Sequence, residues 1–212
     1  MKIVLLWCLN PVNLLSPDMA ALLRVASATS ARWTAKLGTM LTIRAAEIED
    51  AAHIANVHVK TWRATYAGII PETELIQVTT ENRAITWARV IERARDDMPI
   101  LVSENEDGEI VGFISGGGIR SVIPGHEAEI SSLYILPGFQ KSGHGRRLFM
   151  AASNRLSAAG FEGLAVWVLK DNPATAFYKH LGGSLVSSRT IRYGSVDLDE
   201  LAYGWADIPS YG

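Results

Sequence analysis

The chain has 212 residues, of which 48% are hydrophobic and 20% charged, which is enough apolar material for one domain with a full core. Its net charge of −2 leaves no excess of basic residues for binding nucleic acid. The single cysteine, Cys8, excludes a disulfide within the chain and a cysteine-based metal site, and the five histidines lack the spacing of metal ligands. We therefore expect no nucleic-acid partner and no metal.

Residues 1–39 differ from the rest in charge, because they hold four basic residues and one acidic residue and so leave −5 for the remainder. Their apolar run, residues 3–9, is too short to span a membrane and is interrupted by Asn10-Pro11. A signal peptide with Ala26-Ser27-Ala28 at its cleavage site is one interpretation. We favour the other: residues 1–39 are an N-terminal extension, disordered or derived from an upstream start site, and residues 40–212 form one domain.

The first half of this domain predicts two helices and three strands. Apolar residues recur at helical spacing before and after the break at Pro71. Further on, two short β-rich runs flank the turn sequence Glu106-Asp107-Gly108-Glu109, which is typical of a hairpin. The expected elements are a strand at 41–44, helices at 50–66 and 80–95, and hairpin strands at 100–103 and 110–114.

A glycine-containing turn, residues 140–145, connects a predicted strand at 129–135 to a predicted helix that ends at Gly160. The backbone N–H groups at the start of a helix have no partner within the helix, and the helix dipole adds partial positive charge there. Gly143 and Gly145 let the backbone approach a ligand closely. The spacing matches neither a P-loop nor a dinucleotide fingerprint, yet it predicts a pyrophosphate site on backbone amides.

A second strand-and-helix unit follows, with an apolar strand at 164–168 and a helix that ends at Gly182. Asn172 suits the N-cap of this helix and Pro173 suits its first position. Ala174, Phe177, Tyr178 and Leu181 then recur at helical spacing. Two closing segments, 185–191 and 196–205, complete an α+β fold with a central mixed sheet and helices on both faces.

Two of these segments resemble the GNAT superfamily, the acyl-CoA-dependent N-acyltransferases. Residues 140–145 match the pattern Gln/Arg-x-x-Gly-x-Gly/Ala, and residues 172–182 closely resemble the helix after the fifth strand of that superfamily. The resemblance implies a GNAT-like, mostly antiparallel sheet and acetyl-CoA as the acyl donor. It also implies an N-acetyltransferase in the cytoplasm, away from the membrane, whose acceptor is a primary amine of a small molecule or a peptide N-terminus. The amine would attack directly in a ternary complex.

The same resemblance assigns residues to the cofactor. The backbone N–H of Leu133 would polarise the thioester carbonyl, and the backbones of Tyr134 and Ile135 would bind the pantetheine arm as an added strand does. Asn172 would contact the cofactor through the group that its capping role leaves over. The pyrophosphate would lie on the turn and first helical residues: Gln140, Lys141, Ser142, Gly143, His144, Gly145 and Arg146.

The resemblance also implies two catalytic residues, a base and an acid. A lysine-type amine has a pKa of ~10.4, so a nearby carboxylate that removes its proton accelerates attack. Glu129 is our first choice, with Glu127 and a water molecule as alternatives. Tyr178 matches the tyrosine that protonates the leaving thiolate; a phenol pKa of ~10 against a thiol pKa of ~8.5 makes this transfer uphill by about 2 kcal/mol.

The acceptor site is the least defined. Trp62, Arg63 and Tyr66 end the predicted first helix and enter the loop that walls the acceptor site in similar enzymes; core packing is the alternative explanation for Trp62. The identity of the amine and a homodimer stay open. A second class of function is a catalytically degenerate acyl-CoA-binding or regulatory module of the same fold, which the presence of both Glu129 and Tyr178 disfavours.

Overall fold

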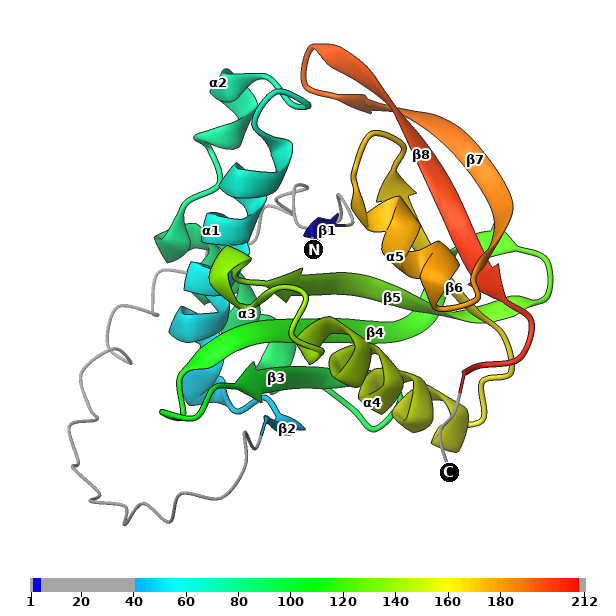
Figure 1. Cartoon of the computed structure of the whole chain (residues 1–212), viewed down its shortest axis with the longest axis horizontal. Coiled ribbons are helices and arrows are strands. Elements are labelled where there is room, and N and C mark those ends of the chain that lie inside the picture. The colour runs from blue at the N-terminus through cyan, green and yellow to red at the C-terminus, as the bar shows by residue number, and fades with distance from the viewer. Residues whose placement is uncertain (1, 5–40, 210–212) are drawn as a thin grey trace.

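The computed structural model describes residues 2–4 and 41–209 (Figure 1). Its sheet has the strand order β2-β3-β4-β5-β6-β8-β7, with β1 added on β5. All neighbouring strands are antiparallel except β5 and β6. The elements are β1 Lys2–Val4, β2 Thr42–Ala45, η3 Ile48–Asp50, α1 Ala51–Tyr66, α2 Glu72–Leu75, α3 Thr80–Glu92, β3 Ile100–Glu104, β4 Ile110–Ile123, β5 His126–Ile135, η4 Pro137–Phe139, α4 His144–Ala158, β6 Leu164–Leu169, α5 Ala174–His180, β7 Ser184–Tyr193 and β8 Val196–Trp205.

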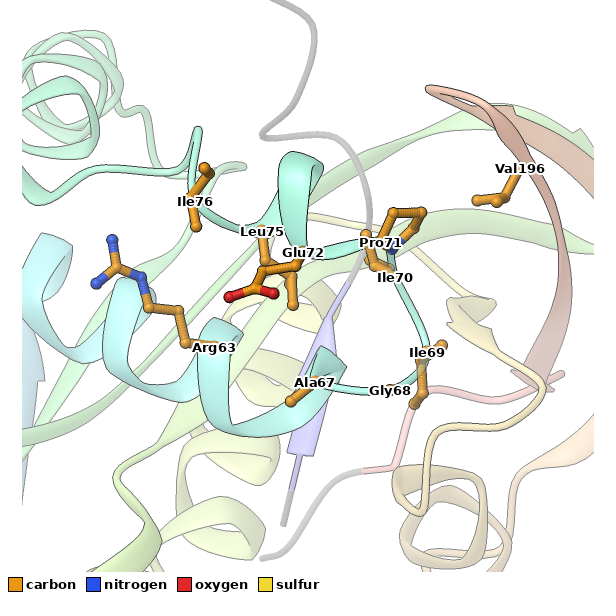
Figure 2. A pocket seen from close by; sticks show the side chains of 10 residues that line it. All are labelled: Arg63, Ala67, Gly68, Ile69, Ile70, Pro71, Glu72, Leu75, Ile76 and Val196. Carbon is orange, nitrogen blue, oxygen red and sulfur yellow. The ribbon is translucent and has the colours of Figure 1, made fainter.

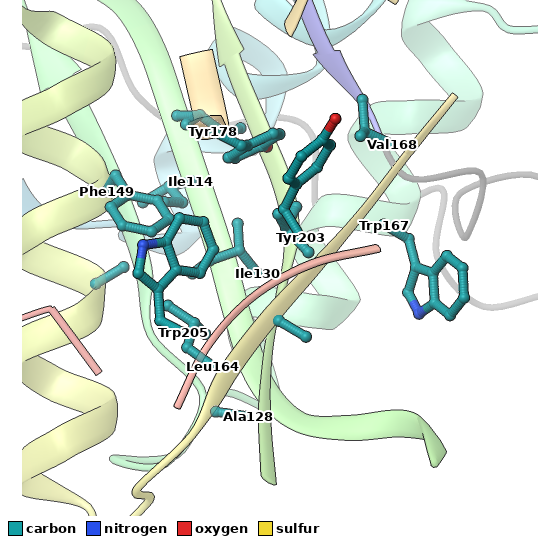
Figure 3. Close-up of a cluster of buried hydrophobic side chains, with 14 of the residues drawn as sticks. Ile114, Ala128, Ile130, Phe149, Leu164, Trp167, Val168, Tyr178, Tyr203 and Trp205 are labelled. Carbon is teal, nitrogen blue, oxygen red and sulfur yellow. The ribbon is translucent and has the colours of Figure 1, made fainter. Parts of the chain in front are cut away.

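The predicted α+β class, with helices on both faces of a mostly antiparallel sheet, is confirmed. One buried cluster packs α4 and α5 against the sheet through residues such as Phe149 and Tyr178 (Figure 3). A second cluster packs α1 and α3 against β3 and β4 through residues such as Trp62, Trp87 and Phe113. Within the described part of the chain, no helix has the length and apolar character needed to cross a bilayer.

Within residues 40–212, two elements differ notably from the sequence prediction. The short helix α2 lies in the segment expected as a loop. Strand β4 continues to Ile123, nine residues past the predicted hairpin strand, because the glycine run 116–118 hides the strand pattern. At Gly116 a Cβ would lie 3.0 Å from the carbonyl oxygen of Glu129, so close packing of β4 on β5 requires the missing side chain.

A β-bulge interrupts the pairing of β4 with β5. Ser115 pairs with Ser132 and Gly116 with Ile130, so Ser131 is the extra residue. The bulge reverses the alternation along β5: Ile130 and Leu133, three residues apart, belong to the same buried cluster, and Tyr134 belongs to the other. Glu129 and Tyr134 therefore lie on the sheet face covered by α1 and α3.

Strands β5 and β6 pair at one end and then separate. Their parallel register covers Ala128 with Leu164 and Glu129 with Ala165. Beyond this point the edge of β5 is paired with β1, whose Lys2, Ile3 and Val4 lie opposite Tyr134, Leu133 and Ser132. β1 also lies beside β6 and α1. The rest of the extension that we expected at residues 1–39 falls outside the described residues.

Candidate active site

The turn before α4 contains a residue in the left-handed conformation, which a glycine favours. Gly143 is the N-cap residue of α4 and has a φ of 92°, in the left-handed region. A Cβ at this position would meet nothing within 4 Å, so conformation rather than space requires glycine. Lys141 also has a positive φ of 63°, which is uncommon outside glycine. Two left-handed residues thus turn the chain sharply into α4.

Three side chains hold this turn in place, two of them through contacts with strands β5 and β3. The Gln140 amide donates a hydrogen bond of 2.9 Å to the carbonyl oxygen of Ile135, and the Ser142 hydroxyl donates one of 2.6 Å to that of Phe139. His144 is buried, and its Nδ1 lies 2.7 Å from the Ser103 hydroxyl. Burial lowers the pKa of His144 below its ordinary value. These three side chains hold the loop in place.

The same arrangement leaves backbone amides for a ligand. No side chain caps the N-terminus of α4, whose first N–H groups lack acceptors within the helix. Lys141, Ser142 and Gly143 are exposed, as is Arg146 in the first turn. An exposed helix N-terminus with basic residues beside it is a suitable site for a phosphate group. The pyrophosphate loop itself stays a prediction.

The predicted acid, Tyr178, lies in the interior among aromatic rings (Figure 3). Its ring centroid is 6.2 Å from that of Trp205 and 6.3 Å from that of Tyr203. The hydroxyl has no hydrogen-bond partner among the described residues. Burial raises the pKa of Tyr178 well above 10, so complete proton transfer to a thiolate is steeper than the sequence comparison implied. Hydrogen-bond donation to developing charge on sulfur fits this phenol better.

Asn172 is occupied at both ends of its amide. Its oxygen accepts from the backbone N–H of Ala174 at 3.0 Å. The N-cap of α5 is Pro173 rather than Asn172, so the helix begins one residue later than the sequence predicted. Its Nδ2 donates to the Tyr66 hydroxyl at 3.2 Å. The amide thus fixes the Tyr66 hydroxyl, and its predicted contact with the cofactor stays a prediction.

Glu129, the predicted base, is buried and ion-paired. Its carboxylate forms a salt bridge with Arg120 on β4 through Oε1. Oε2 accepts from the backbone N–H of Arg120 at 3.3 Å and from its Nε at 3.4 Å. The alternative, Glu127, is exposed, and its Oε2 accepts from the backbone N–H of Glu162 at 3.2 Å. The two carboxylates thus differ in exposure: Glu129 is buried and Glu127 is exposed. The sequence did not predict that Arg120 would be the ion-pair partner of Glu129.

A second buried carboxylate, Glu200 on β8, was not among the predicted residues. Its Oε2 lies 2.7 Å from the Arg189 guanidinium, and its Oε1 has no hydrogen-bond partner among the described residues. The alternation of β8 contains a signal for it: Asp197 and Asp199 point outward and are exposed, whereas Glu200 falls in phase with the inward Ala202. Arg189 also stacks over Trp167, with its Cζ 4.0 Å from the ring centroid.

The residues predicted for the acceptor divide between core and surface. Trp62 and Tyr66 are buried, with ring centroids 4.4 Å apart, and pack in the α1 cluster. Arg63 is exposed and lines a pocket of about 610 Å³ at the end of α1 (Figure 2). The rest of this pocket is the loop after α1, helix α2, and Val196 at the β7–β8 turn. The structure thus brings Arg63 alone of the three to an open surface.

No group of three metal-type ligands is found in the part of the chain that the structure describes. The model of the acetyltransferase (GNAT) family matches residues 62–182. The chain is 34% identical over 169 residues to the uncharacterized N-acetyltransferase YuaI of Bacillus subtilis, covering 80% of this chain and 95% of that protein.

Solved structures share the fold. Ribosomal-protein-alanine N-acetyltransferase from Brucella melitensis is 25% identical, with a TM-score of 0.61 over 78% of this chain and 99% of that one. yncA from Salmonella typhimurium, solved with its cofactor acetyl-CoA, is 24% identical, with a TM-score of 0.60 over 82% of this chain and 96% of that one. The family match over residues 62–182 and the likeness to the Bacillus subtilis relative show that the chain belongs to the GNAT family of acetyltransferases.

Proposed function

We propose that this enzyme transfers the acetyl group of acetyl-CoA to a primary amine, of a small molecule or a peptide N-terminus, by direct attack in a ternary complex. One observation carries the proposal: β5 pairs with β6 only as far as Glu129, and the edge of β5 beyond it, along which β1 lies, is followed by the exposed N-terminus of α4. A ligand with an amide-bearing arm and a pyrophosphate fits that sequence of sites.

The chain offers a contact for each part of acetyl-CoA. The amides of residues 141–146 would hold the pyrophosphate, with Lys141 and Arg146 adding positive charge. The backbones of Tyr134 and Ile135 would hold the pantetheine arm, and the N–H of Leu133 would lie at the thioester carbonyl. The bound cofactor supplies an acetyl group activated as a thioester. That β1 occupies this edge of β5 supports the idea that the edge accepts an extended partner.

Tyr178 supports turnover rather than binding alone. A buried hydroxyl without a partner costs about 1–3 kcal/mol, and a phenylalanine would avoid this cost. A catalytic module has a use for this hydroxyl beside the thiolate, whereas a degenerate binding module has none. We therefore place the module second. The cytoplasm, where acyl-CoA chemistry takes place, stays our predicted compartment.

Release of free thiol from acetyl-CoA, measured across a panel of primary amines, tests the proposal. We expect amine-dependent release, with the acetylated amine as the second product by mass spectrometry. Saturable binding of acetyl-CoA without release for any amine would instead support the binding module. Lack of acetyl-CoA binding would refute both.

A further inference from the structure

Two buried glutamates and two arginines meet on the sheet face that is shared with α1. They come from four strands: Arg120 on β4, Glu129 on β5, Arg189 on β7 and Glu200 on β8. The strand registers place both carboxylates on this face, since Glu129 pairs with Ala165 and Glu200 with Leu169, two positions of like phase on β6. Each glutamate has one arginine partner, but the two pairs are not equivalent.

The difference lies in the carboxylate oxygens. Both oxygens of Glu129 accept hydrogen bonds from Arg120. Only Oε2 of Glu200 is paired, with Arg189, while Oε1 is buried without a partner among the described residues. Glu200 itself is 0% exposed. Three hydrogen bonds from Arg120 thus use most of the acceptor capacity of Glu129, whereas one whole oxygen of Glu200 has no donor among the described residues.

Glu200 also lies close to the groups expected around the reacting atoms. It pairs with Leu169 at the end of β6 that β5 has already left, beside the opening proposed for the pantetheine arm. Burial raises the pKa of Tyr66, whose hydroxyl accepts a hydrogen bond from Asn172, and the negative charge of Glu200 adds to the increase. Burial also raises the pKa of Tyr178, with a smaller contribution from Tyr66.

Burial favours proton transfer from an amine to Glu200. Burial raises the pKa of Glu200 above its ordinary value, with a further increase from Glu129, although Arg189 and Arg120 oppose the shift. A carboxylate whose pKa is raised in this way holds a proton more readily than an exposed one does.

We propose that Glu200 is the catalytic base of this enzyme and takes the proton of the acceptor ammonium on its Oε1, whereas Glu129 is a positioning residue that holds Arg120. This inference rests on the proposed function. The N–H bond of the ammonium breaks, its electron pair stays on nitrogen as the nucleophilic lone pair, and the carboxylate becomes a neutral carboxyl group that later returns the proton to water.

The test compares three charge-removing variants by thiol release as a function of pH. E200Q removes the proposed base, E129Q removes the positioning residue, and D199N removes an exposed carboxylate from the same strand as a matched control. We expect kcat/KM of E200Q to fall at least roughly 10²-fold at pH 7, and this defect to shrink as pH rises toward the pKa of the amine, ~10.4. D199N should match the wild type.

E129Q should show a smaller loss that does not change with pH, because Arg120 loses its partner but the base remains. Acetyl-CoA affinity and melting temperature, measured for every variant, separate these effects from misfolding, and E200D keeps the charge if E200Q does not fold. A pH-independent defect in E200Q, or a pH-dependent one in E129Q alone, would overturn the assignment. Failure of the wild type to release thiol with any amine would refute the proposed function instead.

Discussion

Replacement of Tyr178 by phenylalanine should change stability and activity in opposite directions. The hydroxyl is buried without a partner among the described residues, so its removal relieves a desolvation cost of about 1–3 kcal/mol. The ring, which packs against Phe149, Tyr203 and Trp205, is kept. In a chain of this size 1 kcal/mol corresponds to about 2–4 °C, so we expect a melting temperature that is unchanged or higher by several degrees.

Turnover should fall roughly 10²-fold, because the thiolate loses its hydrogen-bond donor. This corresponds to about 2.7 kcal/mol of transition-state stabilisation. Thiol release under single-turnover conditions with saturating acetyl-CoA isolates the chemical step, and calorimetry gives the affinity for acetyl-CoA, which should change little. Tyr203→Phe, which removes a hydroxyl from the neighbouring buried ring, is the matched control and should retain turnover.

Because stability should rise or stay unchanged while turnover falls, the experiment separates a catalytic role from a structural one. If the variant is destabilised and turnover falls in proportion, the hydroxyl has a structural partner and the packing argument is wrong. If turnover stays near that of the wild type while chemistry limits the rate, Tyr178 is a packing residue and the acid lies elsewhere. A loss in Tyr203→Phe equal to that in Tyr178→Phe would attribute the effect to the aromatic cluster.

Three further predictions concern the turn, the N-terminus and pH. Gly143→Val should abolish CoA binding in titration calorimetry, because valine cannot adopt a φ of 92° without strain; unchanged affinity in a folded variant would refute the loop assignment. A variant that begins at Met40 should fold and bind acetyl-CoA at least as tightly, since β1 no longer occupies the edge of β5; weaker binding or a large loss of stability would show that β1 belongs to the domain. Burial lowers the pKa of His58 well below 6.5, so the folded state binds fewer protons than the unfolded state. The free energy of unfolding, from urea titrations, should therefore decrease as pH falls below about 6.5, and a pH-independent value between pH 7.5 and 5 would contradict this.

Local sequence was sufficient for most elements and for the cofactor loop. Gly160 and Gly182 follow the last turns of α4 and α5 with positive φ, as their positions after a helical pattern predicted. Gly143 likewise adopts the left-handed conformation that glycine permits. These features depend on a few neighbouring residues, so the chain determines them without knowledge of the fold.

The charges around the proposed base depend on tertiary structure. The bulge at Ser131 decides the face of every later side chain on β5, and bulges leave little trace in a pattern of alternating residues. The partner of Glu129 comes from the half of β4 that its glycine run conceals. The sequence therefore predicted Glu129 as a candidate base, but it did not predict that Arg120 balances its charge.

Glu200 also shows what local sequence predicts and what tertiary structure decides. Its phase on β8 could be read from the chain, yet phase alone does not separate a half-exposed strand position from a buried acceptor without a partner. That difference depends on β7 supplying Arg189, on β6 supplying Leu169 as its neighbour, and on β5 separating from β6 at the same place. Local propensity acts over a few residues, whereas the basicity of a buried carboxylate depends on charges brought together from distant strands.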